Sequence, residues 1–150
     1  MQHTSNTLGR LAAGLAIACV AGTALAQASP VGTWKTIDDT TGQPRGEVTI
    51  VKQNDTYSGA LTNVLKEDER TKICTKCTDD RKDKPIVGMT ILSGMKKTGD
   101  NEWSGGTILD PENGKAYSAK MSLSDDGKKL NVRGFIGISL LGRTQTWLRE

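Results

Sequence analysis

Histidine is almost absent from this sequence, and the single one, His3, lies at the extreme N-terminus of the 150-residue chain. The rest of the chain therefore offers no Ser-His-Asp or Cys-His nucleophile and no histidine-ligated metal site. Carboxylates do not fill the gap, because Asp79-Asp80 and Asp125-Asp126 are adjacent pairs in segments where turn preference explains them. We predict no catalytic residue, no metal site and no cofactor. An enzyme that relies on carboxylates or thiols is the alternative.

Long apolar runs are also scarce, since only residues 11–26 form one. This run follows Arg10, is shorter than the roughly 20 residues that span a bilayer, and ends in Ala24-Leu25-Ala26, the pattern that signal peptidase cleaves. We predict a signal peptide over residues 1–26, cut between Ala26 and Gln27, with a second A-x-A pattern two residues later. The remaining residues 27–150 would form one domain in the periplasm or outside the cell.

Two other interpretations of the N-terminus are weaker. An uncleaved anchor conflicts with the short apolar core, and lipidation at Cys19 conflicts with Ala16-Ile17-Ala18, which matches a lipoprotein cleavage box poorly. No second apolar stretch is long enough to cross a membrane, so the protein is not expected to span one.

The 20 Lys and Arg residues are interspersed with 17 Asp and Glu residues, and no basic stripe predicts a nucleic-acid partner.

Alternation of apolar and polar residues dominates the rest of the chain, and helical periodicity is nearly absent. In "AYSAKMSLS", for example, Tyr117, Ala119, Met121 and Leu123 share one face. Turn signals separate such runs, at Gln53-Asn54-Asp55, Thr98-Gly99-Asp100-Asn101, Asn113-Gly114 and Asp125-Asp126-Gly127. The predicted strands lie near residues 32–37, 46–53, 56–65, 86–95, 102–109, 115–123, 128–136 and 143–149.

These hairpins predict an all-β fold, a small antiparallel up-and-down β-barrel of about eight strands. The exception to the tight turns is a charged loop, residues 66–85. Residues 138–142, "ISLLG", are expected to form a helical turn. The glycines inside predicted strands indicate bends, or alternatively interior room for a ligand: Gly59, Gly88, Gly94, Gly105, Gly106 and Gly134.

The charged loop carries Cys74 and Cys77 with two residues between them. In an oxidising compartment a nearby pair is expected to form a disulfide, and its short ring would contribute only about 2 kcal/mol through chain entropy. A redox dithiol is the first alternative, since Lys72 and Lys76 favour a thiolate, but the pair opens no predicted helix. A metal site is the second, and it would need two further ligands.

Both ends of the predicted barrel domain carry tryptophan. Gly32 and Trp34 lie in the first predicted strand, and Trp147 and Arg149 lie in the last. Since the start of the first strand and the end of the eighth meet at one end of the barrel, these four residues are expected to close it. Stacking of the Arg149 guanidinium on the indole of Trp34 would add a cation–π contact; an ordinary core tryptophan beside a solvated arginine is the alternative.

An eight-stranded barrel is either filled by its own side chains or holds one small ligand. We predict that a small apolar or amphipathic molecule binds at the end opposite Trp34, beneath the 66–85 loop. The inward-facing residues expected to line this site are Tyr57, Leu61, Met89, Ile91, Trp103, Tyr117, Met121 and Val132, with Trp103 on the surface if its strand faces the other way. The alternatives are an envelope protein-interaction or structural module acting through its surface and a thiol-redox protein. A monomer or weak dimer is expected.

Four segments resemble one family: "VGTWKTIDD", "CTKCTDDRKDKPIVGM", "EWSGGTILDPENGK" and "VRGFIGISLLGRTQTW". Together they resemble the bacterial domain-of-unknown-function 2147 (DUF2147) family from about Val31 to Arg149. The resemblance implies export in Gram-negative bacteria and a lipocalin-like (calycin-like) barrel. Gly32, Trp34 and Arg149 are similar to the Gly-x-Trp and late-strand arginine of lipocalins. The resemblance implies no catalytic residue.

Overall fold

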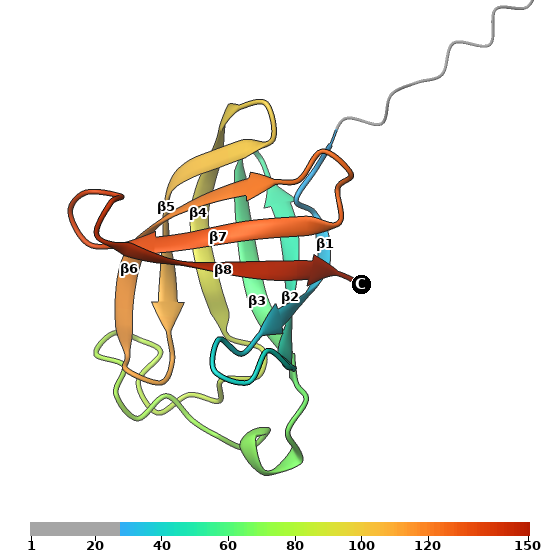
Figure 1. The fold of residues 1–150 in the computed structure, drawn as a ribbon. Coiled ribbons are helices and arrows are strands. Elements are labelled where there is room, and N and C mark those ends of the chain that lie inside the picture. The colour runs from blue at the N-terminus through green and yellow to red at the C-terminus, as the bar shows by residue number, and fades with distance from the viewer. Residues whose placement is uncertain (1–27) are drawn as a thin grey trace, which may run out of the picture.

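Eight antiparallel strands follow one another around a closed barrel in the computed structural model, which describes residues 28–150 (Figure 1). The predicted signal peptide and its Ala26–Gln27 cleavage site lie outside these residues. The strands are β1 (Gly32–Ile37), β2 (Pro44–Gln53), β3 (Thr56–Val64), β4 (Thr90–Gly99), β5 (Glu102–Asp110), β6 (Lys115–Leu123), β7 (Lys129–Phe135) and β8 (Gly142–Arg149).

Each strand pairs with the next in the sequence, and β8 returns to β1, as an up-and-down barrel requires. In residues 28–150 the sole helical element is a single 3-10 turn, η1 (Glu67–Glu69). The all-β prediction is therefore confirmed. Over the same residues, no helix has the length and apolar character needed to cross a membrane.

Side-chain alternation places the core as the sequence indicates. In β6 the side chains of Ala119, Met121 and Leu123 are buried, while Lys120 between them is exposed. Trp103 in β5 faces inward and is 1% exposed, which settles the direction of its strand. Because each strand contributes its inner face, residues 28–150 contain a complete hydrophobic core of their own.

Three predicted boundaries or elements are wrong. The fourth strand spans Thr90–Gly99 instead of residues 86–95. It starts late because residues 86–89 turn through Gly88, whose φ is 87°. The seventh strand ends at Phe135 instead of residue 136, and Ile136 is 65% exposed in the loop that follows. The segment 138–142 forms no helix; a single hydrogen bond from the Leu141 N–H to the Ile138 carbonyl makes a turn within the β7–β8 loop.

The predicted turns connect the expected strands. Asn54 and Asn101 adopt positive φ values of 53° and 57° in the two-residue loops after Gln53 and Gly99. Gly114 and Gly127 adopt 72° and 70° in the turns that follow β5 and β6. Short polar side chains and glycine tolerate this left-handed backbone, which is why the four sequence signals lie at real turns.

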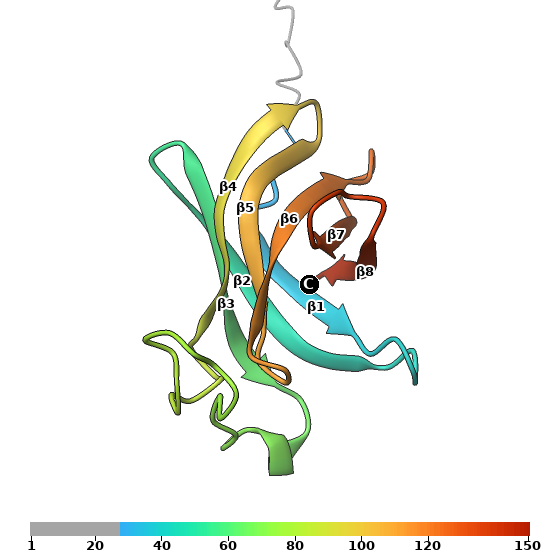
Figure 2. The same ribbon diagram turned by 90° about the vertical axis from the view of Figure 1, so that its left-hand side faces the viewer.

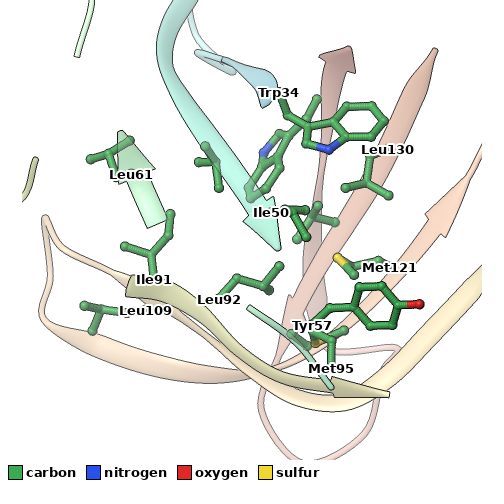
Figure 3. Close-up of a cluster of buried hydrophobic side chains, with 14 of the residues drawn as sticks. Trp34, Ile50, Tyr57, Leu61, Ile91, Leu92, Met95, Leu109, Met121 and Leu130 are labelled. Atoms are coloured by element: carbon green, nitrogen blue, oxygen red, sulfur yellow. The ribbon is translucent and has the colours of Figure 1, made fainter. Parts of the chain in front are cut away.

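One end of the barrel is filled. Five fully buried side chains occupy this end and the centre of the barrel, and Figure 3 shows them in one cluster: Trp34, Ile50, Leu92, Met95 and Leu130. Tyr57 meets Trp103 edge-on, with 5.9 Å between ring centroids. Large aromatic and aliphatic side chains therefore occupy this end of the interior.

Arg149 closes the filled end, as predicted. Its guanidinium lies 4.2 Å from the ring centre of Trp34 and donates hydrogen bonds to the carbonyls of Gly127, Ser29 and Val31. Gly32 leaves the necessary space, because a Cβ there would lie 2.9 Å from Arg149 Nη1. One side chain thus ties the N-terminal segment and the β6–β7 turn to the last strand.

Replacing Arg149 tests this closure. Arg149→Met keeps an unbranched side chain but removes three charge-assisted hydrogen bonds and the cation–π contact, so we expect unfolding free energy to fall by about 2–4 kcal/mol. Urea denaturation gives the value. Arg143→Met is the control, because its exposed ion pair with Asp39 should contribute no more than about 1 kcal/mol. Equal losses in the two variants would contradict the closing role of Arg149.

Candidate functional site: a cavity at the barrel mouth

A cavity of about 1050 Å³ opens at the end of the barrel opposite Arg149 and Trp34. Its wall comes from the ends of β1, β3, β5 and β7, the starts of β2, β4, β6 and β8, and the 66–85 loop. In Figure 1 this loop lies at the bottom of the barrel, away from the start of β1. The buried or half-buried apolar side chains of its lining include Leu61, Ile91, Ile108, Val132 and Trp147.

The eight predicted lining residues divide into three groups. Four line the cavity: Leu61, Ile91, Tyr117 and Val132. Three others face inward but lie in the filled part of the barrel: Tyr57, Trp103 and Met121. In Figure 3, Tyr57 and Met121 lie well apart from Leu61 and Ile91. Met89 lies outside the cavity, in a shallow groove beside Pro85 and Thr90.

Trp147 has a different place from the one expected. It is buried with its indole in the wall of the cavity, and its Nε1–H donates to the side-chain oxygen of Gln145, 3.3 Å away. Trp34, by contrast, donates to the Pro30 carbonyl at the closed end. Only Trp34 therefore plugs the barrel with Arg149, while Trp147 separates the filled part from the cavity.

The in-strand glycines give the cavity little of its room. A Cβ at Gly59 would lie 3.0–3.3 Å from Val48, Ile50 and Leu92, and one at Gly106 would collide with the backbone of β4. These glycines allow close approach in a filled interior. Gly134 differs, because it lines the cavity beside Ile108 and Tyr117.

Charged side chains form the rim, and sequence reasoning did not single them out. Arg45, at the start of β2, forms an ion pair with Glu112 in the β5–β6 turn, on the other side of the mouth. It also lies 3.7 Å from Glu69 and 3.9 Å from Asp38. The hydrogen bond to Glu112 is the main reason why the pKa of Arg45 lies above its usual value. Arg45 therefore stays charged and bridges the entrance.

Two of the carboxylates near Arg45 have pKa values below their usual range. The hydrogen bond from Lys72 lowers the pKa of Glu69, and backbone hydrogen bonds from Thr41 and Thr40 lower that of Asp38. A second pair, Arg143 with Asp39, joins the start of β8 to the β1–β2 turn. The entrance is thus polar while the interior beneath it is apolar.

Tyr117 carries a hydroxyl at this boundary. The Asn113 amide donates to the Tyr117 oxygen at 2.9 Å and to Asp110 at 3.0 Å. This network orients the phenol, which remains half-buried in the cavity wall. The arrangement offers a ligand apolar side chains in the cavity wall, one oriented hydroxyl and charged side chains at the entrance.

Cys74 and Cys77 form a disulfide, with 5.4 Å between their Cα atoms. Both residues are buried, at 0% and 2% exposure, although the loop around them is rich in charged residues. Gly114 explains this burial, since a Cβ there would lie 2.0 Å from the Lys76 carbonyl oxygen. The loop therefore packs directly on the β5–β6 turn and forms part of the cavity wall.

Within residues 28–150 no group of three or more His, Cys, Asp or Glu side chains is placed to hold a metal ion. The buried sulfurs also argue against a redox dithiol, because exchange requires an accessible sulfur.

Glycine-to-alanine variants test the docking of the loop. Gly114→Ala introduces strain at positive φ and a backbone clash, whereas Gly127→Ala introduces similar strain with nothing within 4 Å. We expect a loss of about 1–2 kcal/mol for Gly127→Ala. The loss for Gly114→Ala should be larger, with faster amide hydrogen exchange at Cys77. Equal losses and unchanged exchange would show that the loop is not held by this contact.

The comparisons with known proteins agree with this architecture. The family described as "Uncharacterized protein conserved in bacteria (DUF2147)" matches residues 32–149. No curated protein matches the chain. Among solved structures, protein HP1028 of Helicobacter pylori, described as belonging to the lipocalin family, superposes with a TM-score of 0.70 at 18% identity, over 80% of this chain and 82% of that one. The fold is therefore that of a lipocalin, and the chain belongs to the DUF2147 family.

Proposed function

We propose that this protein is a carrier that binds one small apolar or amphipathic molecule in the cavity at the barrel mouth. The observation that carries the proposal is the cavity itself, about 1050 Å³ and lined by both apolar and polar side chains, with charged residues among them. Small-molecule pockets in proteins typically enclose about 300–1,000 Å³ and combine apolar walls with a few oriented polar groups. The Tyr117 hydroxyl and the Arg45 cluster supply such groups.

The depth of the apolar zone suggests how a ligand would lie. Leu61, Ile91 and Val132 would contact an apolar tail, which would stop at the Trp147 indole. A polar head would remain near Arg45 and Glu112, where its charge or hydroxyls avoid burial. Amphipathic molecules with a single apolar segment suit this arrangement.

We propose binding and not catalysis as the activity, and the periplasm or the extracellular space as the location. The short apolar segment ending in Ala24-Leu25-Ala26 supports export. The Cys74–Cys77 disulfide supports it too, since stable disulfides are typical of oxidising compartments. The absence of histidine after His3 supports a non-catalytic role.

A variant that fills the cavity tests the proposal. Ile108 is half-buried and points into the cavity, so Ile108→Trp should occlude it without disturbing the filled core. Val51→Trp, on the outer surface at 43% exposure, is the matched control. We expect 1-anilinonaphthalene-8-sulfonate and fatty acids to bind the wild type and Val51→Trp, and to bind Ile108→Trp about tenfold more weakly or worse.

Native mass spectrometry of protein from its own cells adds an independent measurement, because a resident molecule should co-purify with the wild type.

Among the tryptophans, only Trp147 lines the cavity, so Trp147→Phe should abolish any ligand-induced change in fluorescence. Equal probe binding by Ile108→Trp, with unaltered urea midpoints, would overturn the proposal and favour action through the outer surface.

A further inference from the structure

The β7–β8 loop, residues 136–141, exposes more aliphatic surface than any other segment of the described chain. Four of its side chains are largely exposed: Ile136 at 65%, Ile138 at 59%, Leu140 at 83% and Leu141 at 71%. Scattered exposed aliphatic residues are ordinary on protein surfaces, but a contiguous group indicates contact with an apolar partner. The loop carries no charged residue, and Arg133 and Arg143 flank it.

Hydrogen bonds hold the loop in this exposed conformation. Arg133 donates from Nε to the Ser139 carbonyl at 2.6 Å and from Nη2 to the Leu140 carbonyl at 3.2 Å. A third bond joins its Nη1 to Thr144 Oγ1 at 2.9 Å. These bonds hold the backbone of residues 139 and 140 against the Arg133 side chain, in the conformation that exposes the aliphatic side chains. Figure 1 shows the loop projecting from the side of the barrel, next to β6.

A row of cations crosses the outer surface at the level of Arg133. From β4 to β8, the residues that lie directly opposite one another are Lys96, Ser104, Lys120, Arg133 and Thr144. We call the three cations among them, Lys96, Lys120 and Arg133, the cationic row. Like charges directly opposite each other, as Lys120 and Arg133 are, destabilise a sheet. Within residues 28–150, none of these three cations forms an ion pair. The acidic residue Glu102 is two positions from Ser104 on β5, and it forms no ion pair with them either.

The loop and the cationic row face the same direction. Figure 2 views the molecule from the side on which the loop projects, and β4, β5 and β6 face the viewer there. Arg133 joins the two features, since it belongs to the row and also supports the loop. One side of the barrel therefore presents an apolar tip beside unneutralised positive charge.

We propose that this side of the protein docks on an anionic lipid bilayer, with the side chains of residues 136–141 in the acyl boundary and the cationic row on the lipid phosphates. An apolar segment combined with Lys and Arg is the arrangement by which peripheral proteins bind anionic membranes. A stable protein dimer would need about 800 Å² from each partner, far more than one loop tip supplies. An unneutralised row of cations also repels a second copy.

Docking in this orientation brings the cavity mouth to the lipid surface, because Ile136 and Leu141 also line the cavity entrance. The inference goes beyond carrier function and does not require an occupied cavity. Vesicle binding and probe binding are separate measurements, so either proposal can fail while the other stands.

Vesicle co-sedimentation of the barrel domain, residues 28–150, tests the proposal. We expect binding to vesicles of equal parts phosphatidylcholine and phosphatidylglycerol, weaker binding to phosphatidylcholine alone, and release by salt. Ile138→Ser/Leu140→Ser should reduce binding by about tenfold or more, because two exposed aliphatic side chains no longer enter the bilayer. Lys96→Gln/Lys120→Gln should reduce it by about fivefold for each lysine.

Two control variants match these changes at other surface positions. Val51→Ser removes an exposed aliphatic side chain on β2, and Lys52→Gln/Lys128→Gln removes two exposed cations near the closed end of the barrel. Both should bind vesicles as the wild type does. Equal binding by the loop, row and control variants, or no binding to anionic vesicles, would overturn the proposal. So would a concentration-dependent dimer in analytical ultracentrifugation that Ile138→Ser/Leu140→Ser abolishes, because the loop would then be a protein contact.

Discussion

The closure of the barrel depends on one short seam. Between β1 and β8, only Trp34 with Arg149 and Lys35 with Leu148 are paired. Arg149 reinforces this seam with its three hydrogen bonds to backbone carbonyls and its contact with Trp34. A closed barrel has no free edge that could pair with another chain, so the seam protects the sheet from aggregation as well as completing the fold.

The same interaction determines where the cavity lies. Arg149 draws the N-terminal segment across one end, and Trp34, Trp103 and their aliphatic neighbours fill the interior behind it. Side chains of this size leave no room at that end. Interior space therefore remains at the opposite end, where Trp147 forms the boundary and the disulfide loop, held by Gly114, supplies part of the wall.

Alternation and turn residues were sufficient to predict most strands, but not depth within the barrel. Residues 115–123 were located without error because clear alternation lies there between two strong turn signals, at Asn113-Gly114 and Asp125-Asp126-Gly127. Tyr57 and Leu61 have the same parity on β3, yet Leu61 lines the cavity and Tyr57 lies in the filled end. The position of a residue along the barrel axis depends on register and neighbouring volumes, which no local pattern contains. The burial of Cys74 depends likewise on a tertiary contact.

The candidate-site residues that sequence reasoning missed are brought together only by the three-dimensional fold. Arg45 and Glu112 meet because β2 and the β5–β6 turn face each other across the mouth. The cations of β4, β6 and β7 align because register places them in one row, and the aliphatic loop lies beside that row because Arg133 binds its backbone. The two proposals are compatible in this geometry, because Ile136 and Leu141 belong both to the exposed loop and to the cavity entrance. A carrier that docks as we propose would present its cavity mouth to the lipid surface from which a small molecule is taken or to which it is delivered.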